Sequence, residues 1–282
     1  MRADLHTHSS RSDGVLTPTE LVLEARRVEL DCVALTDHDS VAGIEEATVA
    51  AQAAGITLIV GVELSVRDSA GVEDHLLGFF IDPRAPSLQT YLGRLQQDRV
   101  AMAEQTIQLL EQLGAPVSRE RVAELAKGAV VTRPHIARAL VEAGHVASEQ
   151  EAFERYLGSG KPASPARPSP DPRTAIEAMR AAGGATALAH PVFSHDPDAQ
   201  ERLAKLAPRL DAMVEAGLQA IECTYPDATP EHTQQLTALA RQRKLVETGG
   251  SDYHGPGKAP YVPLGSVTVD SSVVDALRHL AG

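Results

Sequence analysis

Residues 31–63 read DCVALTDHDSVAGIEEATVAAQAAGITLIVGVE, and this stretch decides the fold class. Cys32–Thr36 and Ile56–Val62 are short apolar runs, which are typical of strands buried on both faces. Between them, Val41–Ala54 has the length and composition of a helix and ends at Gly55, a residue type that readily takes the left-handed conformation found at helix ends. The stretch therefore predicts a strand–helix–strand unit of an α/β protein.

The same rhythm extends along the chain in both directions. Toward the N-terminus, Thr17, Pro18 and Glu20 form a capping box with proline in the first turn, which predicts a helix start. Toward the C-terminus, we expect strands and helices to alternate over residues 184–189, 198–216, 219–224, 230–243 and 244–249. The expected fold class is α/β, with parallel strands in a sheet or a barrel.

Residues 88–157 break this rhythm with one amphipathic helix after another and no strong strand candidate. Thr132-Arg133-Pro134 and the capping box Ser148–Glu151 predict two helix starts, and Gly144 closes the helix between them. The five prolines of residues 158–172 indicate a return linker. We therefore expect a main domain of residues 1–87 and 165–282, and an inserted helical subdomain of residues 88–164 that covers the active-site cleft.

Composition excludes several classes of protein. The chain has 282 residues, of which 43% are hydrophobic, so it can bury a large core and is not disordered. Its formal net charge of -12 argues against binding of duplex nucleic acid. Cys32 and Cys223 lie in apolar runs, which favours buried thiols over a disulfide. Without a signal-peptide pattern or an apolar segment of membrane-spanning length, we expect a cytoplasmic protein with no membrane partner.

Histidines and carboxylates collect at the ends of the expected strands. His6 and His8, two residues apart, can face the same side at the end of the first strand. The complete set at such ends is His6, His8, Asp37, His38, Asp39, Glu63, His75, His190, Asp252 and His254. Because the carboxyl ends of parallel barrel strands open onto one face, we expect these side chains to converge there.

Metal binding is the chemistry that this set favours. A single histidine near a strand end is more often a hydrogen-bonded core residue than a ligand, and we assign no function to His145, His232 and His279 in helical or surface stretches. Several carboxylates and imidazoles in one pocket, however, require a counter-charge that divalent ions supply. Imidazole and carboxylate without thiolate suit Zn, Mn or Fe and do not choose among them.

The chain resembles the PHP (polymerase and histidinol phosphatase) family in motifs that span most of its length. These are Asp4-Leu5-His6-Thr7-His8-Ser9, Ser12-Asp13-Gly14, Leu35-Thr36-Asp37-His38-Asp39, Gly61-Val62-Glu63-Leu64-Ser65, Ala189-His190-Pro191 and Gly250-Ser251-Asp252-Tyr253-His254. Thr132–Ala137 and Tyr156–Pro162 resemble the branch with an inserted helical domain, which includes nucleoside 3′,5′-bisphosphate phosphatases and RNase AM-like 5′ to 3′ exonucleases.

The resemblance implies a distorted seven-stranded, TIM-like (β/α)7 barrel that holds three divalent metal ions. It assigns one ion to His6, His8, Glu63 and Asp252, a second to Glu63, His75 and His190 with Glu63 bridging, and a third to Asp13, His38 and His254. Three such ions outweigh the charge of Asp13, Glu63 and Asp252, so the pocket would attract phosphate despite the acidic chain. Hydroxide formed from a metal-bound water would then hydrolyse a phosphoester.

Other residues are candidates for supporting roles. We expect Asp37 and Asp39 to orient imidazoles rather than to bind metal, because ligating histidines usually donate their second N–H to a carboxylate or carbonyl. Arg133, at a helix start, is a candidate clamp for a second phosphate, and a surface role is the alternative. His135, Lys161 and His195 are further substrate-binding candidates. Phe193 and His195 stand where the similar branch often carries an arginine after Ala-His-Pro, and Ser164 replaces an aromatic residue, so the substrate can differ.

The leading functional hypothesis is a metal-dependent phosphatase that removes the 3′-phosphate from nucleoside 3′,5′-bisphosphates. The alternative is a 5′ to 3′ exonuclease on short 5′-phosphorylated single strands, although with no Trp, four Phe and five Tyr the chain has few residues for base stacking. An amidohydrolase is a further alternative, but it would usually need a ligating lysine where Glu63 stands. A structural metal site with a docking module is the non-enzymatic alternative.

Overall fold

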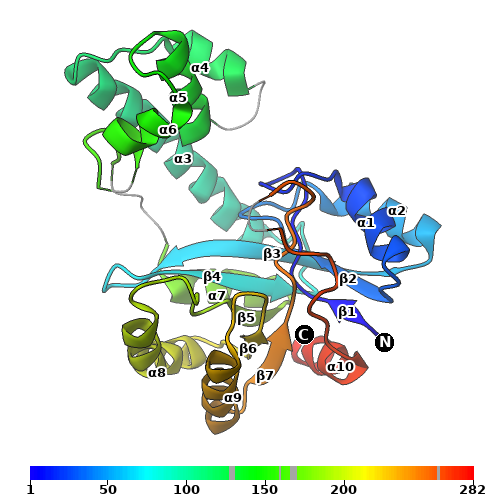
Figure 1. Cartoon of the computed structure of the whole chain (residues 1–282). Coiled ribbons are helices and arrows are strands. Elements are labelled where there is room, and N and C mark those ends of the chain that lie inside the picture. The colour runs from blue at the N-terminus through cyan, green and yellow to red at the C-terminus, as the bar shows by residue number, and fades with distance from the viewer. Residues whose placement is uncertain (127–130, 159, 166–169, 259–260) are drawn as a thin grey trace. The chain divides into compact units, whose positions relative to one another are not determined.

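The main unit of the protein is built on a seven-stranded sheet (Figure 1). The structure is a computed structural model, and it describes residues 1–126, 131–158, 160–165, 170–258 and 261–282. The strands lie in the sheet in chain order: β1 (Ala3–Asp4), β2 (Cys32–Leu35), β3 (Thr57–Arg67), β4 (Glu73–Phe79), β5 (Ala185–Ala189), β6 (Ala220–Thr224) and β7 (Val246–Gly249). A parallel bridge between Thr7 and Tyr253 joins the segments that follow β1 and β7. The sheet is therefore a nearly closed barrel, which confirms the expected α/β fold class.

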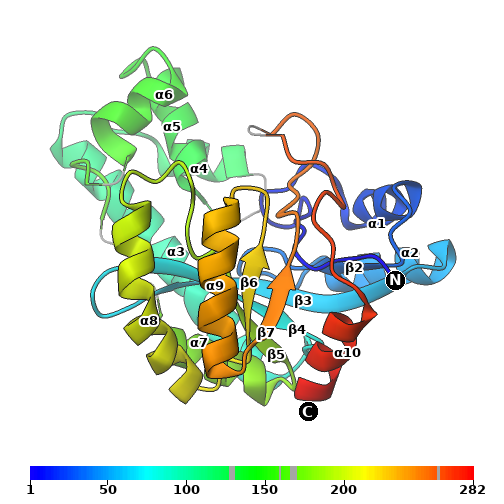
Figure 2. The ribbon, with the colours of Figure 1, turned by 60° about the horizontal axis from the view of Figure 1, so that its bottom comes forward.

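The helices of both units follow here in chain order. They are α1 (Pro18–Arg27), α2 (Ile44–Ala54), α3 (Pro86–Gln112), α4 (Arg119–Ala126), α5 (Arg133–Glu142), α6 (Glu149–Ala152), the π-helix η1 (Phe153–Leu157), α7 (Pro172–Ala181), α8 (Ala199–Glu215), α9 (Pro230–Arg243) and α10 (Ser271–Leu280). In the main unit α9 packs against β6 and α10 against β7 (Figure 2). No helix among the described residues is long and apolar enough to cross a membrane.

One strand runs against the others, which corrects the expectation of an all-parallel barrel. β4 is antiparallel to both β3 and β5, whereas the other neighbouring strands are parallel. β3 also continues to Arg67, five residues beyond the predicted end at Val62. It does so because the pairing with β4 extends from Gly61–Phe79 to Arg67–Glu73. Asp68 then turns the chain by accepting hydrogen bonds from the backbone N–H groups of Ala70 and Val72, each at 2.9 Å.

Alternation along the strands divides the core of this unit into two layers. On β2, Cys32 and Ala34 belong to a buried cluster with inward residues of β1, β4, β5 and β6, to which α10 adds Val274 and Leu277. Val33 and Leu35, on the opposite face of β2, pack instead with residues of α1 and α2. Many residues of the first cluster are alanines, including Ala185, Ala187 and Ala189 on β5, and small side chains suit the narrow interior of a small barrel.

The inserted helices form a unit with a core of its own. The chain divides by contacts into Met1–Tyr91 with Pro170–Gly282, and Leu92–Ser169. Every secondary-structure element among the described residues of the second unit is a helix, and its core joins Ile107 and Leu110 of α3 to Ile136 and Leu140 of α5 and Leu157 of η1. The predicted return linker, residues 158–172, lies partly outside the described residues, since 159 and 166–169 are not among them.

Local signals in the sequence match their local structures. Thr17 caps α1 in a reciprocal capping box with Glu20, as predicted. Gly55 ends α2 in the left-handed conformation with a φ of 66°, which an L side chain would disfavour. Cys32 and Cys223 are free and buried, and burial raises the pKa of each thiol to about 12. Both cysteines therefore act as small core residues.

Candidate metal centre

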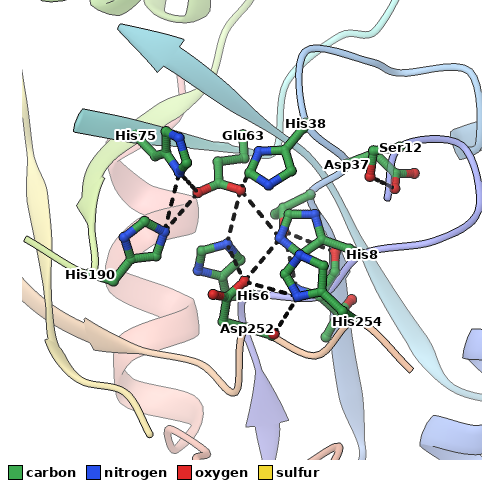
Figure 3. Close-up of polar contacts among 12 residues, drawn as sticks. His6, His8, Ser12, Asp37, His38, Glu63, His75, His190, Asp252 and His254 are labelled. Atoms are coloured by element: carbon green, nitrogen blue, oxygen red, sulfur yellow. Dashed lines mark hydrogen bonds and ion pairs between the residues drawn. The ribbon is translucent and has the colours of Figure 1, made fainter. Parts of the chain in front are cut away.

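The structure brings together nine side chains from distant parts of the sequence (Figure 3). They come from the segment after β1, the loop after β2, the middle of β3, the start of β4, and the segments after β5 and β7. Their ligand atoms form four overlapping groups, with all atoms of a group within 4.8 Å of one another. The groups are His8, Asp13, His38 and His254; His6, Glu63 and His190; His6, His8 and Asp252; and His38, Glu63 and His75.

Glu63 lies at the centre of the cluster. It is held there within β3, which continues past it to Arg67. Its Oε1 is 2.9 Å from His75 Nδ1 and 3.0 Å from His190 Nε2. Its Oε2 is 2.9 Å from His38 Nδ1, 3.2 Å from His8 Nε2 and 3.3 Å from His6 Nε2. The two oxygens of one fully buried carboxylate thus face two different sets of imidazoles.

The antiparallel strand explains how His75 reaches this edge of the barrel. His75 lies near the start of β4, between Ser65 of β3 and Ala189 of β5 in the ladder. The start of an antiparallel strand lies at the same edge as the ends of its neighbours. His75 Nδ1 is consequently 3.4 Å from Nε2 of His190, the residue after β5.

A second focus lies around Asp13 and Asp252. Asp13 Oδ1 is 3.2 Å from His254 Nε2 and 3.9 Å from His8 Nδ1. Asp252 Oδ1 is 3.1 Å from His8 Nε2 and 3.4 Å from His6 Nε2. His8 therefore faces both carboxylates through its two ring nitrogens, so it belongs to two groups, whereas the motifs placed it in one.

Several polar atoms of the cluster are buried without a hydrogen-bond partner. These atoms are His6 Nε2, both ring nitrogens of His8, His38 Nδ1 and Glu63 Oε2. Leaving such atoms unsatisfied costs about 1–3 kcal/mol each, so native proteins rarely tolerate several in one place. Lone pairs of nitrogen and carboxylate oxygen that converge in this way fit bound divalent cations, and the absence of thiolate suits Zn, Mn or Fe.

The charges of the cluster depend on one another. Burial by itself would raise the pKa of Glu63, but the surrounding imidazoles of His38, His6 and His75 hold that pKa well below its ordinary value. The pKa of Asp252 is lowered in the same way, against burial, mainly by His6. Conversely, burial would lower the pKa of His6, but the carboxylates of Glu222, Glu63 and Asp252 raise it well above its usual value. The site is therefore built to hold ionised carboxylates next to positive charge.

The backbone is strained at two of the candidate metal ligands, His190 and Asp252. Asp252 has a φ of 51° and His190 a φ of 21°, and residues other than glycine seldom adopt such positive angles. Gly250 makes the close approach to the first strand possible, since a Cβ there would lie 2.5 Å from His6 Cβ. Backbone strain and a required glycine together indicate that this edge is shaped for the cluster and not only for packing.

Glu222 on β6 is a residue of the site that the sequence analysis missed. Both its carboxylate oxygens lie 3.2 Å from His6 Nδ1, and Oε2 accepts a hydrogen bond from the backbone N–H of His190 at 2.8 Å. A carboxylate only accepts, so Nδ1 of His6 carries a proton, and Nε2, which faces Glu63 and Asp252, is the nitrogen that a metal ion could bind. The signal in the sequence was a charged residue within the apolar run Ala220–Cys223.

A backbone carbonyl orients a second histidine in a comparable way. His254 Nδ1 lies 2.7 Å from the carbonyl oxygen of Asp252, which can only accept a hydrogen bond, so Nδ1 carries the proton and Nε2 faces Asp13. Carboxylates and carbonyls that fix the tautomer of a ligating histidine are common around metal sites.

Asp37 has a different set of partners from the one expected. Its carboxylate accepts hydrogen bonds from the backbone N–H of Ser9 and from the hydroxyls of Ser9 and Ser12, each at 2.7 Å, and among the described contacts none of its partners is an imidazole (Figure 3). The loop that it holds is the one that carries Asp13. Asp39 likewise accepts from the backbone N–H of Ser65 at 2.9 Å. Both carboxylates position backbone next to the cluster.

The substrate-binding candidates lie in different surroundings. Arg133 Nη1 donates to the carbonyl of Leu157 at 3.2 Å, and His135 Nδ1 accepts from the backbone N–H of Thr132 at 3.1 Å, which closes the first turn of α5. Lys161 is exposed. His195 follows β5, is 77% exposed and lies 3.3 Å from Asp227.

Comparison with known proteins identifies the class of this site. The model of the PHP domain matches residues 4–157. A 5′-3′ exoribonuclease of Haemophilus influenzae is 39% identical over 90% of both chains, and a 3′,5′-nucleoside bisphosphate phosphatase of Chromobacterium violaceum is 33% identical over 90% of this chain and 88% of its own. A solved structure named as a metal-dependent phosphoesterase of Bifidobacterium adolescentis superposes with a TM-score of 0.80 at 31% identity, covering 99% of this chain and 96% of the other.

Proposed function

The chain belongs to the PHP domain family and is a metal-dependent phosphoesterase, and we propose that it cleaves the bond between phosphorus and the 3′ oxygen of a 5′-phosphorylated nucleotide. In a nucleoside 3′,5′-bisphosphate, water adds to the 3′ phosphorus, the 3′ oxygen leaves with a proton, and a nucleoside 5′-monophosphate and inorganic phosphate form. In a 5′-phosphorylated RNA, the same cleavage releases the first nucleotide and leaves a new 5′-phosphate. One reaction thus accounts for the names of both relatives.

We propose the nucleoside 3′,5′-bisphosphate as the preferred substrate. The observation that carries the proposal is the convergence of the nine-residue cluster, with five buried atoms lacking hydrogen-bond partners, in a chain so similar to a phosphatase of that specificity. With few aromatic residues, the chain has little capacity to stack a long single strand, which favours a small substrate.

The nine residues would hold up to three divalent cations of Zn, Mn or Fe. We assign His6, His8, Glu63 and Asp252 to one, Glu63, His75 and His190 to a second, and Asp13, His38 and His254 to a third. When bound, such ions lower the pKa of a water molecule and neutralise charge on phosphoryl oxygens. Glu63 divides its two oxygens between the first two sets. Glu222 keeps the proton of His6 on Nδ1, and Asp37 holds the loop of Asp13 in place.

Short 5′-phosphorylated RNA is the second candidate substrate. It is favoured by the 39% identity to an exoribonuclease over nine-tenths of both chains. For either substrate, Arg133 is our candidate for binding a second phosphate, since guanidinium matches phosphate in geometry and α5 begins there. His135 and Lys161 are further candidates in the inserted unit, and His195 is one in the main unit.

The test compares two substrates under defined metal loading. Protein loaded separately with Mn, Zn or Fe is assayed with adenosine 3′,5′-bisphosphate and with a 5′-phosphorylated pentaribonucleotide, and kcat/KM is compared. We expect turnover of the bisphosphate with the higher kcat/KM, and none with His8→Ala. In water enriched in 18O, the label should appear in the released phosphate and not in the adenosine monophosphate. Label in the nucleotide, or no turnover of either substrate with any of the metals, would refute the proposal.

A further inference from the structure

The segment after β5 places two rings beside the metal cluster. The ring centroid of Phe193 lies 5.0 Å from that of His190, and that of His195 lies 5.5 Å from that of Phe193. The same His190 ring reaches the cluster with Nε2, 3.0 Å from Glu63 Oε1. An aromatic surface therefore starts at a candidate metal ligand and extends outward from it.

The outer part of this surface is open to solvent. Phe193 is only partly buried although it is apolar, and the side chain of His195 is 77% exposed. Val192, next to Phe193, and Tyr225, which bonds to Val192, are buried and belong to the core, whereas the side chain of His195 is exposed. Packing of the core therefore does not account for this imidazole.

Hydrogen bonds join the segment to Tyr225 and Asp227. Asp227, after β6, accepts from the backbone N–H of Ser194 at 2.5 Å and from its hydroxyl at 2.8 Å, and it lies 3.3 Å from His195 Nδ1. The hydroxyl of Tyr225 bonds to both the N–H and the carbonyl of Val192. Rings held in place before a ligand arrives lose little entropy when it binds.

We propose that Phe193 and His195 form a stacking platform for the nucleobase of the substrate. A phenyl ring offers a phosphate no hydrogen bond, whereas it can stack on the face of any base. A nucleotide whose 3′-phosphate lies at the cluster carries its base one sugar away, and the platform begins at the ring next to His190. The ligand class is thus a nucleotide with a base, in preference to a sugar phosphate without one. This inference rests on the proposed function and adds the recognition of the base.

The test measures the preference for a base. For wild type and variants, kcat/KM for adenosine 3′,5′-bisphosphate is divided by kcat/KM for 1,2-dideoxyribose 3,5-bisphosphate, which has no base. We expect this ratio to fall about tenfold in Phe193→Leu, mostly through KM, because leucine fills the space against His190 but has no aromatic face. Phe193→Trp should retain the ratio, and His195→Ala should lower it. Metal content, measured by elemental analysis, should be the same in wild type and Phe193→Leu.

A ratio in Phe193→Leu equal to that of wild type would overturn the platform. If the unchanged ratio comes with an equal loss of kcat/KM for both substrates, Phe193 is assigned to support of His190 instead. If wild type hydrolyses neither compound, the proposed preference for the bisphosphate fails, and the platform is tested by calorimetry instead. In that case adenosine 5′-monophosphate should bind more tightly than 1,2-dideoxyribose 5-phosphate to wild type but not to Phe193→Leu. Equal affinities in wild type would refute the platform.

Discussion

Replacement of Glu222 by glutamine should weaken metal binding without unfolding the protein. The carboxylate of Glu222 holds the N–H of His6 and the backbone N–H of His190, which our proposed assignment places at two metal sites. A glutamine of the same size keeps one oxygen acceptor but puts an NH2 group where the second oxygen was. An amide oxygen at the position of Oε2 still reaches both N–H groups, but the N–H of His6 loses its second acceptor, and the negative charge that strengthens the basicity of His6 is lost with it.

The expected magnitude follows from these contacts. A hydrogen bond to a charged group contributes about 1.5–3 kcal/mol. Loss of one such bond behind a ligating histidine corresponds to about 10- to 100-fold in metal affinity, which is also the range for removing an outer partner of a metal ligand. Because Glu222 is fully buried, solvent cannot replace the missing acceptor, so we expect the upper part of that range.

The assay is a competition titration of each variant with a chelator of known affinity, followed by elemental analysis. The matched control is Glu247→Gln on the neighbouring strand β7. Glu247 pairs with Arg241 and Thr237 at the surface and not with a histidine, so this variant should bind metal as wild type does. Thermal unfolding of the metal-free proteins separates loss of affinity from loss of fold. Equal metal affinity in Glu222→Gln and wild type would refute the role assigned to Glu222.

Three further predictions concern stability and metal. Removal of metal by a chelator should abolish turnover and lower the melting temperature, because ions at 100 times their Kd stabilise the folded state by about 2.7 kcal/mol. Readdition of Mn should restore turnover and melting temperature. An unchanged melting curve after chelation would argue against bound ions. Gly250→Ala should cost about 2 kcal/mol in urea unfolding, since its Cβ would lie 2.6 Å from His6 N, and wild-type stability would contradict that contact. Arg209→Leu should cost about 3 kcal/mol by leaving Asp74 and Asp68 without this partner. A loss below 1 kcal/mol would show that other groups compensate.

Elements with a local cause could be predicted from the sequence. The helix after Thr17 begins where its capping box places it, because the cap and Glu20 act within a single turn. The helix of residues 230–243 was predicted with the bounds of α9, between Thr229 as cap and the left-handed Lys244. β2 and α2 follow from hydrophobic runs closed by a turn or by Gly55. Each of these signals acts over a few residues.

Features that depend on a distant partner were missed. β3 extends through Glu63 because it pairs with β4, and the residues Gly61–Glu63 considered alone do not predict that extension. Whether Asp37 would bind an imidazole or a serine loop depended on which segment passes beside it, and Ser9 and Ser12 do. The only sign of Glu222 in the sequence was a charged residue in an apolar run. Its role could not be predicted, because its partners His6 and His190 are 216 and 32 residues away.

By itself the sequence determined the α/β class and the residue types available for metal chemistry, because periodicity, caps and side-chain identity are local properties. Tertiary structure alone decided that β4 runs antiparallel, that Glu63 divides its oxygens among five imidazoles, and that Glu222 lies behind His6. The physical reason is that a metal centre depends on ligand atoms a few ångströms apart, and such distances are fixed by strand register and packing between segments that do not adjoin in the chain.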